Sequence, residues 1–299
     1  MKRIPVTLEI AAVSDVGQHH ASNEDNFYVN GCYIDHYKVK AERFETVDTE
    51  DVHILAVCDG MGGLKDGDVA AMMGVTTLSE FSDDLIEADS FDRASLITRK
   101  MVHEASERII RRSKRNQKPM GATFSMLAVS ANYLYACNIG DSEIYHKSRY
   151  SMEQLSKPQT YVQELVDHGA ITENQASHSM VRNQLTKYLG MENARMLQPN
   201  ECSGELFNGD ILLICSDGIS NTLATHTIYS CLNSNRPVKE IADTIIGKAI
   251  RKGCGDDMTV VVARVIDDGR DALLRRRLAV LLAVAVGVVG LFSLLLWLL

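Results

Sequence analysis

The chain has 299 residues, of which 45% are hydrophobic and 23% are charged, and its formal net charge is −8 at pH 7. This composition is typical of a folded globular protein with one large domain or two small ones. The acidic balance argues against nucleic acid as a main partner, because binding to a phosphate backbone requires a basic surface. The seven cysteines are scattered and form no Cys-x-x-Cys pair, which favours reduced thiols in a cytosol over disulfides or a zinc site.

The hydrophobic pattern predicts strands and helices in a mixed order. Short β-branched or aromatic runs predict strands over residues 6–13, 27–34, 53–58, 122–129, 133–139, 143–146, 211–215 and 259–265. Apolar residues at helical spacing predict helices over 69–81, 91–115 and 237–252. This order favours two sheets with flanking helices rather than a regular βαβ alternation.

The C-terminal 22 residues, 278–299, contain no charged side chain. As a helix they would span roughly 33 Å, enough to cross a hydrocarbon core of about 30 Å. Residues 267–277 form a polar linker that ends in Arg275, Arg276 and Arg277, and these arginines place the preceding domain on the cytoplasmic side. The prediction is a single-pass membrane protein with a cytoplasmic domain; a buried core helix is the alternative.

Five acidic clusters lie at the ends of predicted strands. They are Asn23-Glu24-Asp25, Asp59-Gly60, Gly140-Asp141, Asp217-Gly218 and Gly255-Asp256-Asp257. Each cluster alone is typical of a tight turn. If the strand ends converge, however, the carboxylates would repel one another and their pKa values would rise unless cations lay between them. Oxygen ligands of this kind suit Mg²⁺ or Mn²⁺, and the Gly60 carbonyl is a further candidate ligand.

These clusters belong to a longer series of motifs. The series comprises Ser14-Asp15-Val16-Gly17, Asn23-Glu24-Asp25, Asp59-Gly60-Met61-Gly62-Gly63, Gly121-Ala122-Thr123, Asn138-Ile139-Gly140-Asp141-Ser142, the segment 182–190, Ser216-Asp217-Gly218 and Gly255-Asp256-Asp257-Met258-Thr259-Val260. In this order the motifs resemble the metal-dependent Ser/Thr protein phosphatases, the PPM or type 2C family, and particularly the bacterial members. The resemblance extends over nearly the whole region before the linker.

The resemblance implies an α+β fold over residues 1–266: a PPM-type α-β-β-α sandwich of two antiparallel sheets flanked by helix pairs. It implies two Mn²⁺ or Mg²⁺ ions bridged by Asp59, with Asp217 and Asp256 on one ion and Glu24 and the Gly60 carbonyl on the other. By the same resemblance, Asp25 orients water or ligates indirectly, and Asp141 marks a third, weaker ion site. Residues 159–184 resemble the mobile flap of the family.

The mechanism implied by the resemblance is attack on phosphorus by a hydroxide that bridges two ions, which lower the pKa of the water. The expected partners are phosphoserine and phosphothreonine proteins, Ser/Thr kinases and their targets, and the membrane. Two other functions stay open. One is a catalytically silent scaffold that binds phosphoproteins at the membrane, and the other is a hydrolase of small phosphorylated molecules.

The sequence departs from the family pattern at three positions. His20 stands where an arginine usually clamps the substrate phosphate. It either donates a hydrogen bond to the phosphate and protonates the leaving group, or is an exposed loop histidine. Asp257 replaces an asparagine, which adds a negative charge near the cluster, and Glu143 replaces an arginine at a position expected to be structural. Met61 stands where some eukaryotic members have a histidine, so His20 or water must supply any acid.

Overall fold

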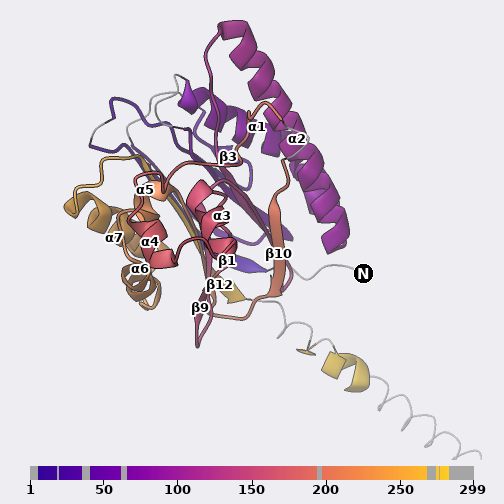
Figure 1. Cartoon of the computed structure of the whole chain (residues 1–299). Helices are drawn as coiled ribbons and strands as arrows, with labels where there is room; N and C mark the ends of the chain where they lie inside the picture. Colours follow the sequence, from indigo (N-terminus) through magenta and orange to yellow (C-terminus); the bar gives the residue numbers. More distant parts are fainter. Residues whose placement is uncertain are drawn as a thin grey trace, which may run out of the picture.

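Two antiparallel sheets form the centre of the molecule, and helices cover their outer faces (Figure 1). The computed structural model describes residues 6–18, 20–35, 41–61, 66–193, 197–267, 274–275 and 277–282. In these residues one sheet has the strand order β4-β1-β12-β11-β8-β9 and the other β10-β7-β6-β5-β2-β3.

The strands are β1 (Thr7–Asp15), β2 (Asn26–Val29), β3 (Cys32–Tyr33), β4 (Ala41–Asp48), β5 (Val52–Cys58), β6 (Phe124–Ser130), β7 (Tyr133–Ile139), β8 (Glu143–Lys147), β9 (Met152–Gln154), β10 (Asn200–Glu205), β11 (Ile211–Cys215) and β12 (Met258–Asp267). The helices are α1 (Gly67–Glu87), α2 (Phe91–Asn116), α3 (Tyr161–Asp167), α4 (Glu173–Ser177), α5 (Asp217–Ser220), α6 (Thr225–Leu232) and α7 (Val238–Arg251).

The central strands are apolar on both faces because both faces are buried. In β1, Leu8 and Ile10 pack into the cluster between the two sheets. Ala11 and Val13, which point to the other side of the strand, pack instead against α6 and α7 on the outer side. Alternate residues of these strands therefore face two different cores, one on each side of the sheet. This explains why the sequence of these strands is continuously hydrophobic.

The helices divide between the two outer faces. The cluster that contains α1 and α2 packs on β5, β6 and β7, and the cluster that contains α6 and α7 packs on β1, β11 and β12. The four layers confirm the expected α-β-β-α sandwich. The ends of α2 also follow the sequence, since the side chain of Ser90 accepts a hydrogen bond from the Arg93 amide and Gln117 ends the helix in a left-handed conformation.

Several elements differ from the prediction. The strand expected over 27–34 is a hairpin, because Asn30 and Gly31 adopt φ values of 45° and 91° and turn the chain between β2 and β3. The prediction over 69–81 was too short for α1. Strands β4, β9 and β10 were not predicted. All three are edge strands and contain few apolar residues.

The predicted membrane span over 278–299 falls mostly outside the residues that the structure describes. Among the described residues, no helix has the length and apolar character needed to cross a bilayer.

Candidate functional site

The acidic clusters meet at one end of the sandwich. In one sheet, Asp59 follows the end of β5 and Asp25 precedes the start of β2, and the pairing of Asn26 with Cys58 brings the two together. In the other sheet, the pairing of Cys215 with Val260 places the end of β11 beside the start of β12. The strand register thus places the acid motifs of each sheet side by side, as their position at strand ends indicated.

The charges of these acids act on one another, so the acids of the two sheets are close in space. Burial raises the pKa of Asp59 well above its usual range, and the charges of Asp25, Asp217, Asp141 and Asp256 raise it further. Burial and the charge of Asp217 likewise raise the pKa of Asp141. Burial and the charge of Asp256 raise the pKa of Asp217 to about 6, and the side chain of Asp59 is close enough to affect it as well.

Two carboxylates of the cluster have a buried oxygen without a hydrogen-bond partner among the described residues. These are Oε2 of Glu24 and Oδ2 of Asp25. Asp25 is only 6% exposed, and burial together with the charge of Asp257 raises its pKa strongly. Burial also raises the pKa of Glu24 to about 7. A buried acceptor oxygen with no donor is costly, and a hard divalent cation would satisfy it. The residues therefore fit the divalent cations that the sequence suggested.

Backbone contacts hold Asp59 and Gly60 in place. The Asp59 amide donates to Oγ1 of Thr123 at 3.0 Å, and the Asp59 carbonyl accepts from the Thr123 amide at 2.8 Å. A Cβ on Gly60 would lie 2.4 Å from the Gly67 carbonyl oxygen and 2.5 Å from that of Glu24. No other residue type fits this position, because α1 starts directly against the loop of Glu24.

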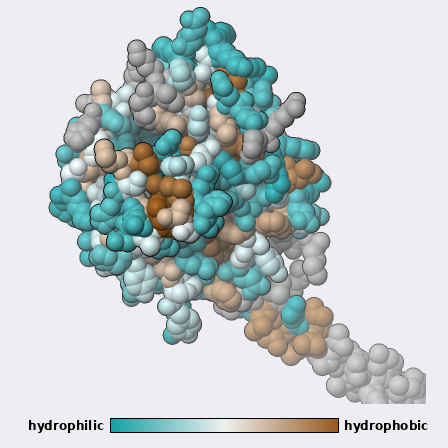
Figure 2. Space-filling model, in the orientation of Figure 1, coloured by the Kyte–Doolittle hydropathy of each residue, from teal (hydrophilic) through white to brown (hydrophobic). Residues whose placement is uncertain are grey.

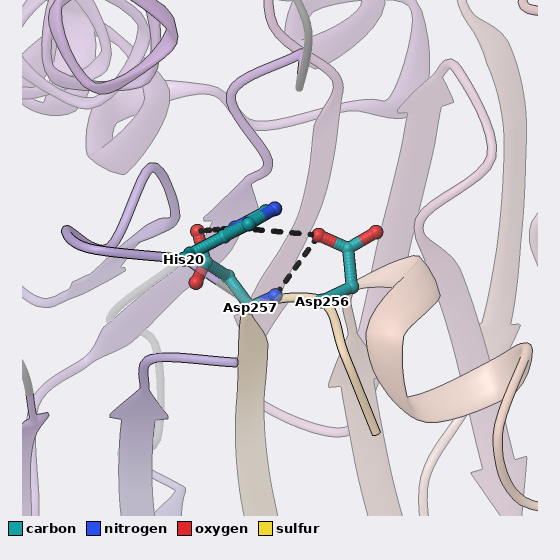
Figure 3. A group of neighbouring side chains, drawn as sticks. All are labelled: His20, Asp256 and Asp257. Carbon is teal, nitrogen blue, oxygen red and sulfur yellow. Dashed lines mark hydrogen bonds and ion pairs between the residues drawn. The ribbon is translucent and has the colours of Figure 1, made fainter. Parts of the chain in front are cut away.

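His20 lies at the edge of the cluster, beside the last pair of acids (Figure 3). Its Nδ1 is 3.1 Å from Oδ2 of Asp257 and 3.7 Å from Oδ1 of Asp256. Burial lowers the pKa of the imidazole, but its contact with Asp257 and the charges of both aspartates outweigh that effect and raise it. The side chain is 31% exposed, so it is partly buried against two acids and also open to solvent.

Asp257 has a structural contact that the sequence did not reveal. Its Oδ1 accepts from the Gly17 amide at 3.0 Å, and its Oδ2 accepts from the Glu24 amide at 2.7 Å. The carboxylate therefore ties the loop of His20 and Glu24 to the start of β12. From the sequence, Asp257 had been interpreted only as an extra negative charge.

Residues 159–184, which resemble the flap of the family, contain the short helices α3 and α4. Thr160 and Thr172 cap the two helices, and the Tyr161 amide donates to the Gln184 carbonyl where the segment rejoins the body. The charge of Arg182 acts on Asp217 and opposes the rise of its pKa. Arg182 begins the 182–190 motif, but no role was predicted for it from the sequence; a basic residue in a flap-like segment beside an acidic cluster was the available signal.

A cavity of about 790 Å³ lies elsewhere, at the end of the sandwich away from the acids. Its lining includes Val52, at the start of β5, and Phe91, at the start of α2. Since β5 separates Val52 from Asp59 by seven residues, the two sites are about 23 Å apart. This cavity is therefore separate from the acid cluster.

Comparisons with known proteins agree on one family. A family model described as protein phosphatase 2C matches residues 40–246. The serine/threonine protein phosphatase PstP of Mycobacterium tuberculosis is 30% identical over 267 residues, which are 89% of this chain and 47% of that relative. The chain therefore spans about half the length of PstP. The serine/threonine phosphatase stp of Listeria monocytogenes is 29% identical over 263 residues, 87% of this chain and 97% of the relative.

Solved structures show the same likeness. The crystal structure of the catalytic domain of PstP, in complex with two manganese ions, superposes with a TM-score of 0.70 at 30% identity. The superposition covers 88% of this chain and all of that domain.

Proposed function

This chain belongs to the protein phosphatase 2C family, and from that membership we propose that it hydrolyses phosphoserine and phosphothreonine in proteins with the help of two divalent cations. The observation that carries the proposal is the convergence of acids from both sheets on one site, with buried carboxylate oxygens on Glu24 and Asp25 that lack a protein donor. The manganese ions of the related PstP domain support the same choice of metal.

We assign the cation ligands as the motifs suggest. Asp59 would contact both ions, Asp217 and Asp256 would complete one, and Glu24 with the Gly60 carbonyl would complete the other. Asp25 would orient water, and Asp141 would hold a third, weaker ion. When bound, such ions lower the pKa of a coordinated water and screen the charge of the phosphate.

The remaining residues of the site orient the substrate. His20 faces the acids and solvent at once, so its imidazole can donate to a phosphate oxygen or to the leaving oxygen of serine or threonine. Arg182 supplies a second cation near Asp217, where a guanidinium can donate to phosphate oxygens. Together the two residues offer what the missing arginine at position 20 would otherwise supply.

We propose further that residues 278–299 anchor the protein in a membrane, with residues 1–266 as the cytoplasmic domain that opposes Ser/Thr kinases there. In support, β12 begins at Met258, two residues after Asp256, and ends at Asp267, nine residues later, or about 30 Å away. The linker would thus leave the domain at the end opposite the acids, and the site would face the cytosol. Fractionation of cells that express the full chain or residues 1–277 tests this, and a full chain recovered in the soluble fraction would refute it.

The catalytic proposal is tested by phosphate release from a phosphothreonine peptide in Mn²⁺, Mg²⁺ or EDTA. Turnover should require the cation, and Asp59→Asn or Asp217→Asn should abolish it. Asp51→Asn, which changes an exposed acid of the β4–β5 connection, is the matched control and should leave turnover unchanged. Cation binding without turnover would favour the second candidate, a catalytically silent scaffold that binds phosphoproteins. The absence of an arginine at position 20 supports that candidate.

The role of His20 is tested separately. If His20 takes part, His20→Ala should lower kcat/KM, whereas His20→Arg, which also donates to phosphate, should retain phosphate binding. A large gain from arginine with no loss from alanine would show that the histidine takes no part.

A further inference from the structure

The C-terminal part of α2 and the residues that follow it are strongly basic. Residues 108–118 include six basic side chains and no acid, although the whole chain has a net charge of −8. These side chains, here called the basic end of α2, are Arg108, Arg111, Arg112, Lys114, Arg115 and Lys118. The four arginines stand at positions i, i+3, i+4 and i+7, so they share one face of the helix.

The last turns of α2 project beyond the core. Ala105 and Ile109 are fully buried. Arg112 lies seven residues after Ala105 and so on the same side of the helix, yet it is exposed. Figure 1 shows this end of α2 extending past the body of the molecule, and Figure 2 shows that the corresponding surface is hydrophilic. Arg111, Arg112 and Arg115 are therefore exposed to solvent.

The basic end of α2 lies at the same end of the molecule as the acid cluster. Nζ of Lys118 is 3.2 Å from Oδ1 of Asp66. Asp66 directly precedes Gly67, where a Cβ would lie 2.4 Å from Oε2 of Glu24. Five residues after Lys118, Thr123 hydrogen-bonds the backbone of Asp59, and five residues span at most about 17 Å.

Structural roles account for only part of this charge. Arg108 pairs with Glu80 and Glu104, and Lys118 pairs with Asp66. Lys114 and Arg115 occupy the last turn of α2 and interact favourably with the helix dipole. Among the described residues, however, Arg112, Lys114 and Arg115 have no ion pair, and the dipole effect does not require an arginine stripe that begins two turns earlier.

We propose that the basic end of α2 binds acidic residues that flank the phosphorylated residue of a protein substrate. This inference rests on the proposed function and specifies its substrate class. A peptide whose phosphorylated residue lies at the acid cluster would reach the basic end of α2 about four to six residues away, since extended chain covers about 3.3 Å per residue. The acids of the site repel an acidic protein, and a basic surface at this distance offsets that repulsion.

The test compares two charge-neutralising double variants of the full chain. Arg112→Gln with Arg115→Gln removes two bases that have no ion pair among the described residues. Arg93→Gln with Lys100→Gln, in the half of α2 nearer its N-terminus, is the matched control. Each protein is assayed on two phosphothreonine peptides that differ only in their flanks, one with glutamates four to six residues from the phosphothreonine on both sides and one with glutamines there.

An exposed ion pair contributes a factor of about two to three in binding, so two lost pairs should lower kcat/KM for the acidic peptide about four- to tenfold. The change should lie in KM and should disappear in 0.5 M salt, because exposed charges are then screened. The glutamine peptide and the control variant should stay within twofold of the unchanged protein. An equal loss on both peptides, or no loss on either, would overturn the proposal.

Docking and catalysis are separated by a binding measurement. Fluorescence anisotropy of the labelled acidic phosphopeptide reports docking even if no phosphate is released. An unchanged protein that binds this peptide several-fold more tightly than the Arg112/Arg115 variant, without turnover, would refute the phosphatase proposal but support the docking surface. Equal affinities would refute the docking surface whatever the turnover.

Discussion

Asp257 provides a strong test of how the site is built. The side chain is 4% exposed, and its two oxygens accept the amides of Gly17 and Glu24. Asp257→Ala leaves both N–H groups without an acceptor. Each buried group left unpaired costs about 1–3 kcal/mol, or about 2–6 kcal/mol for the pair.

Two effects reduce this loss. Water can enter the space left by the Asp257 carboxylate from the side of His20, which is partly exposed. Removal of the charge also relieves Asp25 and Glu24, whose pKa values Asp257 raises. The expected net destabilisation is about 2–4 kcal/mol, which for a domain of this size lowers Tm by about 4–16 °C. Asp257→Asn should be intermediate, because the amide keeps one acceptor oxygen but turns its NH₂ towards the other N–H.

The measurement is thermal unfolding in EDTA, so that cation binding does not contribute. Asp51→Ala, in an exposed connection, is the control and should shift Tm by less than about 1 °C. If Asp257→Ala behaves like this control, water replaces the carboxylate fully and the argument that Asp257 organises the loop is wrong.

Three further predictions concern charge. Saturating Mn²⁺, at about 100 times its dissociation constant, should stabilise the protein by about 2.7 kcal/mol per site. The stabilisation should be smaller at pH 5, because protons compete with the cation for the acids. Calorimetry with and without EDTA at both pH values tests this prediction. Arg182→Ala should lower kcat/KM for phosphopeptides roughly tenfold while Arg182→Lys retains part of the activity, and equal activity of all three proteins would exclude a contact with the substrate. Burial lowers the pKa of His146, but the hydrogen bond and charge of Asp210 raise it overall, so the protonated pair stabilises the fold below about pH 6.5 and is lost as pH rises through the raised pKa. The Tm difference between the unchanged protein and His146→Gln should therefore shrink from pH 6 to pH 9, and a constant difference would contradict it.

The parts of the fold that the sequence predicted are those where one energetic factor dominates. The helix over 91–115 was found within one residue because its apolar stripe is long and Ser90 caps its start. The central strands were recognisable because both of their faces are buried. The convergence of the acids followed from their shared position at strand ends.

The missed elements depend on tertiary contacts. Strand β4 contains Glu42, Arg43 and Glu45, and its residues are mostly exposed, so its composition does not favour a strand. It forms because β1 offers a full row of hydrogen-bonding partners at the sheet edge. Strand β10 is also an edge strand and pairs with β7 in the same way. Local propensity says little about such positions.

The acids of the site fall into two kinds, which are distinguished by what their oxygens contact. Both oxygens of Asp257 accept backbone amides, so its charge is satisfied by the protein itself. Glu24 and Asp25 instead have buried oxygens without donors, and burial raises their pKa values. A carboxyl group whose pKa is raised on folding destabilises the fold increasingly as pH rises above its ordinary value, since the unfolded chain then ionises more easily. Near neutral pH the cation-free cluster therefore opposes folding, and the three hydrophobic layers must outweigh it. The same arrangement favours a divalent cation at the site, because a cation would satisfy the oxygens of Glu24 and Asp25 that have no donor among the described residues.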